Sequence, residues 1–288
     1  MNLGPYIQSQ LPEPKQTLEN CEIFEKLWTE EFDSLQQATS GQTDIVYPRE
    51  WSQKDRYADI QPSVNRVRLS VEHPVFGDYI NADLCADETG QPLILTQAPL
   101  RNTKVDFARM LLDQMVNLVL SLSSEPDDLD DYLNQVDYTD DNVLCVVESK
   151  ELCTTILGHS LEVTKHLMKI KLGDSTRELT VLRVNNWKDR CMPERVGDLV
   201  DLLLECQRLV VATSPAVIHC MAGVGRTGVM AVAWRMLEAL QLRRSLPLTT
   251  DCLLRIRQVR RHAVQTKIQY IGLQILRLHM LNRFQHLN

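Results

Sequence analysis

The sequence predicts an α/β fold, on the evidence of three hydrophobic patterns. A β-branched pair, Val217–Ile218, precedes a stretch rich in helix formers from Thr227 to Leu240, which indicates a buried strand that leads into a helix. Residues 143–184 alternate β-branched and polar side chains in several runs, which is typical of antiparallel strands joined by turns. Helically spaced apolar residues predict amphipathic helices that pack on the body of the protein over residues 19–37, 194–209 and 271–284.

The length and composition are those of a soluble globular chain. With 288 residues, the chain suits one large or two small domains. Its 44% hydrophobic and 24% charged content is ordinary for such proteins. We expect neither a membrane span nor a signal peptide, because apolar runs stay well short of about twenty residues and no basic region precedes an apolar stretch at the N-terminus.

Cysteine spacing and net charge restrict the partners and cofactors. The eight cysteines contain no Cys-x-x-Cys pair, which argues against a structural zinc site, and we expect no metal or organic cofactor. Free cysteines without an export signal indicate a reducing, cytoplasmic compartment. The net charge of −7 gives no support for a nucleic-acid partner or an anionic membrane surface. Any phosphate site must therefore be a local positive patch.

The strand-to-helix turn within residues 216–228 carries the chemistry. Its backbone N–H groups and the positive end of the following helix would converge on a dianionic phosphate, and they would favour the nucleophilic thiolate of Cys220. Arg226 follows by six positions, where its planar fork can bind two phosphate oxygens at once. Thr227 can stabilise the sulfur as a leaving group, and Gly223 and Gly225 permit the tight turn. The alternative is a buried cysteine in a glycine-containing turn.

This loop resembles the active-site loop of the cysteine-dependent phosphatases, whose pattern is His-Cys, five residues, Arg, then Ser or Thr. His219, Cys220, Arg226 and Thr227 match it. The resemblance implies a nucleophilic cysteine with a phosphate-binding arginine, and a phosphate cradle made by Met221, Ala222, Gly223, Val224 and Gly225. Two interpretations stay open for His219, which either fixes the loop through hydrogen bonds or is a plain core residue.

A second segment, residues 54–60, is similar to the Lys-Asn-Arg-Tyr-x-Asp loop of tyrosine-specific protein phosphatases. Tyr57 and Asp59 match that loop, and Asp55 stands where Asn is usual. The resemblance implies that Tyr57 walls a deep cleft and stacks on the substrate ring, while Asp59 binds the peptide backbone. Depth selects phosphotyrosine, because the shorter phosphoserine cannot reach a nucleophile at the bottom.

A third segment supplies a candidate proton donor. Phenolate is a poor leaving group, since tyrosine has a pKa of about 10, so an acid near the ester oxygen should matter. Trp187 and Asp189 match the Trp-Pro-Asp loop of the same family, which lies some thirty residues before its cysteine and closes over the substrate. Lys188 replaces the proline, and residues 190–192 differ from the usual His-Gly-Val. The proline helps to set the loop backbone, so this change puts the rate in doubt more than the identity of the acid.

Near the C-terminus, residues 264–270 resemble the family's Val-Gln-Thr-x-x-Gln-Tyr stretch. This implies that Gln265 positions the water that attacks the cysteinyl phosphate and that Gln269 assists. Taken alone, two glutamines four positions apart are an ordinary polar helix face. His262 stands where the family often has Gly beside the pocket.

The resemblance covers about residues 20–285 in one order, which implies a single catalytic domain. We expect a poorly ordered lead-in over residues 1–18, a tyrosine phosphatase domain over 19–288, and a twisted mixed sheet with helices on both sides. A less family-like acidic segment remains, interpreted as a solvated loop with a metal site as the alternative. It holds Asp127, Asp128, Asp130, Asp131, Asp137, Asp140 and Asp141.

The sequence therefore predicts a monomeric protein tyrosine phosphatase that acts on phosphotyrosine-containing proteins through a phosphocysteine. The compartment is the cytosol, either of its own cell or of a host cell into which it is delivered. Three alternatives remain: an inositol-phosphate or lipid phosphatase with the same loop, a catalytically weak phosphotyrosine binder, and a structural scaffold. The segment around Tyr57 and the glutamine pair argue against the first, and the presence of Cys220, Arg226 and Asp189 argues against the second.

Overall fold

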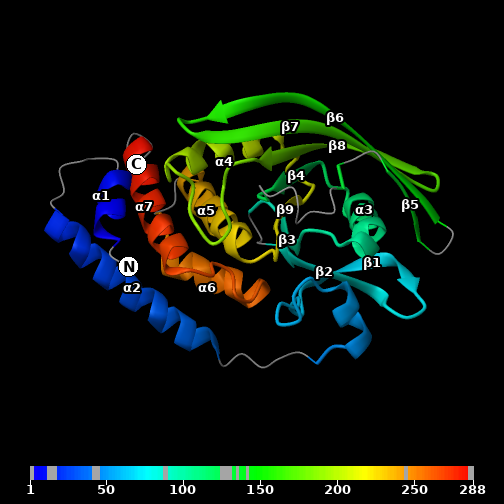
Figure 1. The fold of residues 1–288 in the computed structure, drawn as a ribbon, viewed down its shortest axis with the longest axis horizontal. Helices are drawn as coiled ribbons and strands as arrows, with labels where there is room; N and C mark the ends of the chain where they lie inside the picture. The colour runs from blue at the N-terminus through cyan, green and yellow to red at the C-terminus, as the bar shows by residue number, and fades with distance from the viewer. Residues whose placement is uncertain are drawn as a thin grey trace.

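The computed structural model describes residues 3–11, 18–40, 46–86, 90–123, 132–133, 136–140, 143–242 and 246–284. Within these residues a nine-stranded sheet runs in the order β1-β2-β3-β9-β4-β8-β7-β6-β5 (Figure 1). The strands are β1 (Arg66–His73), β2 (Gly77–Cys85), β3 (Leu93–Gln97), β4 (Leu118–Ser121), β5 (Val136–Asp140), β6 (Val143–Leu157), β7 (Leu161–Leu172), β8 (Ser175–Val184) and β9 (Ala216–Cys220). The α-helices are α1 (Gly4–Gln10), α2 (Leu18–Ser40), α3 (Lys104–Asp113), α4 (Asp198–Leu209), α5 (Gly225–Gln241), α6 (Thr249–Val259) and α7 (Lys267–Arg283), and short 3-10 helices are η1 (Arg49–Lys54) and η2 (Arg101–Thr103).

The sheet is mixed, as the sequence predicts. Strand β9 lies at the centre between β3 and β4 and is parallel to both, and β4 is also parallel to β8. The outer pairs, β1 with β2, β2 with β3, and β5 through β8, are antiparallel. Parallel strands are typically buried on both faces, and every residue of β3, β4 and β9 is buried.

Helices cover both faces of the sheet and create two cores (Figure 1). Helix α3 packs on one face, where Val217 joins its apolar cluster. Helices α4, α5, α6 and α7 pack on the other face, where Ile218 and Cys220 join a second, larger cluster. Successive side chains of a strand point to opposite faces, so this alternation places Cys220 on the face that carries α5. The strand-turn-helix unit predicted around Cys220 is confirmed.

The N-terminus differs from the sequence prediction. Residues 1–18 are expected to be a poorly ordered lead-in, but residues 4–10 form helix α1, with Pro5 in its first turn. Proline is favourable there because its ring pre-sets the helical φ angle and its missing N–H would have no helical partner. Ile7 is fully buried in the larger core and anchors this short helix. Residues 12–17 lie outside the described residues.

The predicted acidic segment falls mostly outside the described residues, at 124–131, 134–135 and 141–142. Its backbone at Val136–Asp140 forms strand β5. In the part of the chain that the structure describes, no group of three or more His, Cys, Asp or Glu residues is placed to hold a metal ion. The helices within that part are also too short or too polar for any of them to cross a membrane.

Candidate active site

Cys220 is the last residue of the central strand and is only 2% exposed. Cys220 also begins a loop, residues 220–224, whose carbonyl oxygens accept hydrogen bonds from donors outside the loop. The N–H of Ala98, just beyond β3, donates to the carbonyls of both Cys220 and Met221, at 2.9 and 3.0 Å. Ala98 and Met221 also form a small buried contact. The end of β3 therefore fixes the first turn of the loop.

The next three carbonyls are bound in the same way. Arg260 donates from Nη2 to the carbonyl of Ala222 and from Nε to that of Gly223, both at 3.1 Å. The N–H of Val264 donates to the carbonyl of Val224 at 3.0 Å. Five consecutive carbonyl groups of the Cys220 loop are thus engaged by the surrounding protein.

Outward carbonyls imply inward amides. A trans peptide points its N–H opposite to its C=O, so the N–H groups of residues 221–225 face the inside of the loop. Helix α5 begins at Gly225, and its positive end opens at the same place. Converging amides and a helix N-terminus form a binding site for a phosphate-like anion directly beside the sulfur of Cys220.

Gly223 is required by this geometry. Its φ angle is +72°, in the left-handed region that side chains disfavour. A Cβ added there would lie 2.2 Å from the carbonyl oxygen of Thr96 on β3. The loop can approach the strand this closely only with glycine at this position.

Two buried donors are open inside the site. Arg226 and Thr227, in the first turn of α5, are both 0% exposed. Arg226 Nη1 donates to the carbonyl of Trp187 at 2.8 Å, whereas its Nε and the Thr227 hydroxyl have no hydrogen-bond partner among the described residues. A buried donor without a partner is costly, so a bound anion is the natural partner for these two groups.

Asp189 reaches Arg226 from the neighbouring loop. Its Oδ1 lies 3.2 Å from Arg226 Nη2, and its side chain is 45% exposed. The indole of Trp187 is fully buried and donates to the carbonyl of Cys191 at 2.8 Å, which closes the loop behind Asp189. Arg190 has a φ angle of +58°, a strained value for a residue with a side chain. The structure thus brings the candidate acid to the anion site predicted from the spacing.

The loop that carries Tyr57 lies against the Cys220 loop. Ile60 packs with Ala222 and Val224 in a small apolar cluster. Tyr57 is 43% exposed, and Asp59 beside it is also exposed. Both side chains are therefore at the surface, on a loop that packs against the Cys220 loop.

Asp55, where the resemblance has Asn, is bound from the second strand. Its Oδ1 accepts from the Tyr79 hydroxyl and from Asn81 Nδ2. Burial raises the pKa of the Asp55 carboxyl, and these hydrogen bonds act against that shift. The carboxylate thus takes a structural place at the base of the Tyr57 loop.

The two candidate glutamines, one just before α7 and one in its first turn, lie close to the start of α5. A Cβ on Gly225 would lie 2.6 Å from Gln265 Oε1 and 3.1 Å from Gln269 Nε2, so both amides lie against the start of α5, where the Cys220 loop ends. Gln269 is fully buried, and its Oε1 accepts from the N–H groups of Gln265 and Thr266 at 2.9 and 3.2 Å. Gln269 therefore also caps helix α7 and holds the backbone of Gln265 in place.

His219 supports the loop from the β9 side. Its Nε2 lies 2.8 Å from the Tyr132 hydroxyl and its Nδ1 lies 3.4 Å from the carbonyl of Cys220. Burial lowers the pKa of His219 to about 4, so the imidazole is neutral near pH 7. Both interpretations of His219 therefore apply, because the side chain is fully buried and also makes hydrogen bonds beside the Cys220 loop.

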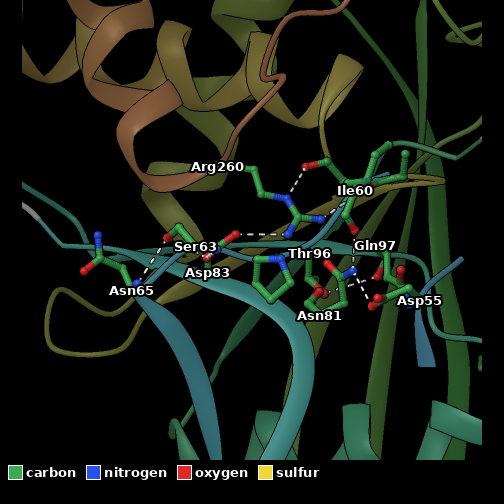
Figure 2. A network of polar contacts seen from close by, with 12 residues as sticks. Asp55, Ile60, Ser63, Asn65, Asn81, Asp83, Thr96, Gln97 and Arg260 are labelled. Atoms are coloured by element: carbon green, nitrogen blue, oxygen red, sulfur yellow. Dashed lines mark hydrogen bonds and ion pairs between the residues drawn. The ribbon is translucent and has the colours of Figure 1, made fainter. Parts of the chain in front are cut away.

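Arg260 is a functional residue that the sequence did not single out. Figure 2 shows its guanidinium between the Cys220 loop and β2, where Nη1 lies 3.0 Å from Asp83 Oδ2. Both side chains are 0% exposed, and Asp83 Oδ1 also accepts from the N–H and hydroxyl of Ser63. In the sequence Arg260 looks like one half of a basic pair with Arg261. Its partner Asp83 is 177 positions away in the chain, so no local sequence pattern indicates that the two residues pair.

Comparisons with known proteins identify the family. The family model described as protein-tyrosine phosphatase matches residues 51–277. Tyrosine-protein phosphatase non-receptor type 23 from mouse is 25% identical over 272 residues, which are 91% of this chain and 16% of the mouse protein. Tyrosine-protein phosphatase 1 from Dictyostelium discoideum is 28% identical over 233 residues, 73% of this chain and 44% of that protein. The chain thus spans about a sixth of its non-receptor type 23 relative.

Solved structures share the fold. The catalytic domain of human protein tyrosine phosphatase non-receptor type 18 has a TM-score of 0.75 at 24% identity, covering 90% of this chain and 96% of that one. A structure of the type 18 enzyme with HER2 phosphopeptides has a TM-score of 0.74 at 25% identity, covering 90% of this chain and 99% of the other. The chain belongs to the protein-tyrosine phosphatase family, with the family's α/β fold.

Proposed function

We propose that this chain hydrolyses phosphotyrosine in proteins through a phosphocysteine intermediate on Cys220. One observation carries the proposal. The Cys220 loop turns five carbonyls outward and leaves its amides, Arg226 Nε and the Thr227 hydroxyl open toward one point, with Asp189 at 3.2 Å from the arginine. A trigonal phosphoryl group in transfer needs such donors around its equatorial oxygens, a nucleophile on one side and an acid on the other.

In the first step, the Cys220 thiolate forms a bond to phosphorus while the ester bond to the tyrosine oxygen breaks. Arg226 and the loop amides bind the equatorial oxygens, and Asp189 gives its proton to the leaving phenolate. In the second step, a water held by Gln265 loses a proton to Asp189 and attacks phosphorus. The sulfur–phosphorus bond breaks, phosphate leaves, and Thr227 donates to the departing thiolate.

The substrate class is supported by the Tyr57 loop and by the relatives. Tyr57 is exposed beside the anion site, where an aromatic wall can stack on a phenyl ring. The type 18 enzyme of similar fold has been solved with phosphopeptides. We further propose that residues 19–288 form one catalytic domain that acts as a monomer in a reducing, cytosolic environment, which keeps the Cys220 thiol free.

Parallel assays test the proposal. Purified protein is given phosphotyrosine peptides and inositol polyphosphates, and released phosphate is measured with Cys220→Ser as the inactive control. We expect release from the peptides and little from the inositol phosphates. A strong preference for inositol polyphosphates would assign a different substrate class, and peptide binding without release in a single turnover would make the chain a phosphotyrosine-binding protein.

A further inference from the structure

The N-terminal helix α1 contacts the segment that follows the acid loop. Gln10 Nε2 donates to the carbonyl of Glu194 at 2.9 Å, and Gln10 Oε1 accepts from the N–H of Val196 at 2.9 Å. A single side-chain amide thus pairs with both polar groups of the backbone at 194–196, as a neighbouring strand would. This clamp joins positions 184 and 186 residues apart in the chain.

Helix α1 is itself fixed to the body of the protein. Ile7 is fully buried in the larger core. The carbonyl of Gln10 lies 2.6 Å from His279 Nε2 on α7, and the N–H of Leu3 donates to Glu25 Oε2 on α2 at 2.7 Å. Figure 1 shows α1 beside α7 and next to α2. Gln10 therefore connects the backbone at the end of the acid loop to a helix that is itself held by α2 and α7.

The rest of the acid loop has other anchors. Arg226 binds the carbonyl of Trp187 at the start of the loop, and Thr266 Oγ1 donates to the carbonyl of Arg190 at 3.0 Å. Met192 lies against α7, because a Cβ on Gly272 would be 2.5 Å from Met192 Cγ. The loop is thus held at its start by α5 and in its middle by α7. The Gln10 clamp holds the end through which it joins α4.

Asp189 sits between these anchors with a half-exposed side chain, so its position depends on them. We propose that helix α1 braces the acid loop, and that Gln10 is a positioning residue that keeps Asp189 over Cys220 during proton transfer. This inference rests on the phosphotyrosine hydrolysis proposed above. In this account Gln10 touches no substrate, and its effect on the reaction passes through Asp189 alone.

Leaving-group dependence tests the role of Gln10. The Gln10→Ala variant is compared with the wild type on a phosphotyrosine peptide, whose phenol needs a proton donor, and on an aryl phosphate whose phenol is a strong acid and leaves without one. Losing two neutral hydrogen bonds should lower kcat/KM on the peptide about three- to tenfold. On the activated substrate kcat/KM should change by less than about twofold, because kcat/KM reports only the steps up to phosphoryl transfer to Cys220, and a strongly acidic phenol leaves in that transfer without a proton from Asp189.

Two further variants complete the design. In an Asp189→Asn background, Gln10→Ala should produce no further loss on the peptide, because Gln10 acts on the reaction only through the Asp189 carboxyl. Gln207→Ala is the matched control, since Gln207 also makes two side-chain hydrogen bonds, to Gln241, at a surface between α4 and α5. It should leave kcat/KM on both substrates unchanged. Thermal unfolding of each variant measures the structural cost of each substitution.

The outcomes separate the inference from the function. An equal loss on both substrates, or an additional loss in the Asp189→Asn background, would overturn the role of Gln10 while the hydrolysis stands. A wild-type protein that releases no phosphate from either substrate would refute the hydrolysis itself. A loss confined to the peptide, absent from Asp189→Asn and from Gln207→Ala, is the result that the brace predicts.

Discussion

The Cys220 loop and the acid loop around Asp189 meet at one site but are built differently. Residues 220–224 are buried, and each carbonyl of this stretch is bound by Ala98, Arg260 or Val264. In the acid loop Asp189 is 45% exposed, and Lys188 and Arg190 beside it are also exposed. One loop is part of the core, and the other is a surface segment held at a few points.

This difference separates two tasks of catalysis. Stabilising a phosphoryl group during its transfer requires hydrogen-bond donors that are fixed before the substrate arrives. If the donors had to move into place, the energy of that reorganisation would offset the stabilisation that they provide. Proton donation requires an acid on a loop that can open to admit the substrate and then close over it. Surface loops with few buried contacts can move in this way. Changes in the Cys220 loop should therefore affect folding and binding, whereas changes in the acid loop should affect the rates of the proton transfers.

The largest effect on rate is expected from the acid itself. Asp189→Ala should lower phosphotyrosine turnover by roughly 10² to 10⁴, or about 3 to 5 kcal/mol, because the phenolate would leave without a proton. Steady-state kcat measures this. Asp33→Ala is the control, since Asp33 is a similarly exposed carboxylate paired with Lys267. Unchanged turnover in the Asp189 variant would show that another group is the acid.

A large effect on stability is expected from the support of the Cys220 loop. Arg260→Met leaves Asp83 buried without its cation and frees two loop carbonyls, so the free energy of unfolding should fall by about 3 to 5 kcal/mol. Urea unfolding measures the loss. Arg283→Met removes an exposed ion pair with Asp201 and should cost about 1 kcal/mol or less. Equal losses in the two variants would contradict the contrast between the buried cradle and the surface.

A smaller effect is expected from pH, through His219. The pKa of His219 is lowered from 6.5 to about 4, chiefly by burial, with Arg183, Arg226 and Arg56 adding positive charge nearby. The unfolded chain therefore binds a proton that the folded chain excludes, and this group removes stability as pH falls from 6.5 toward 4. Its slope is at most about 1.4 kcal/mol per pH unit.

Urea unfolding across this pH range, for the wild type and His219→Asn, measures that slope. We expect the variant to be less stable but to lose less stability on acidification. His262 and His279, whose pKa values are also lowered by desolvation, contribute equally to both proteins and so cancel in the comparison. Identical slopes would show that His219 does not titrate in this window.

The smallest effect is expected at Lys188, in the acid loop. Lys188→Pro would restrict the loop backbone and reduce the entropy lost on closing, so kcat on phosphotyrosine should rise about two- to fivefold. Stability should change little, since Lys188 is exposed. A fall in kcat would mean that the backbone at this position is incompatible with proline, and that Lys188 is required by the loop conformation.

The sequence predicts the site better where its parts are local. The strand, turn and helix around Cys220 and Arg226 follow from a short pattern, because backbone geometry alone brings these residues together. The positions of Asp189 and Gln265 relative to Cys220 follow only from resemblance, since their approach depends on how distant segments pack. Their roles remain predictions, while the approach of Asp189 to Arg226 is seen in the structure.

Long-range polar contacts are the part that could not be predicted. In the sequence, Asp83 lies in a predicted strand with no sign of a functional role, and Arg260 belongs to an Arg-Arg pair of the kind usually found on a solvated surface. Only tertiary packing turns them into a buried ion pair. Helix α1 could not be predicted for the same reason. A seven-residue helix is too short to be stable alone, and tertiary contacts of Ile7 and Gln10 stabilise it.

The central claim is that phosphate passes through Cys220. The Gln265→Ala variant, which lacks the side chain proposed to hold the hydrolytic water, is mixed with a phosphotyrosine peptide, quenched in acid within one turnover and mapped by mass spectrometry. The account predicts one phosphoryl group on the peptide that contains Cys220, at a higher level than in the wild type. Release of phosphate with no phosphoryl group on Cys220 would contradict it.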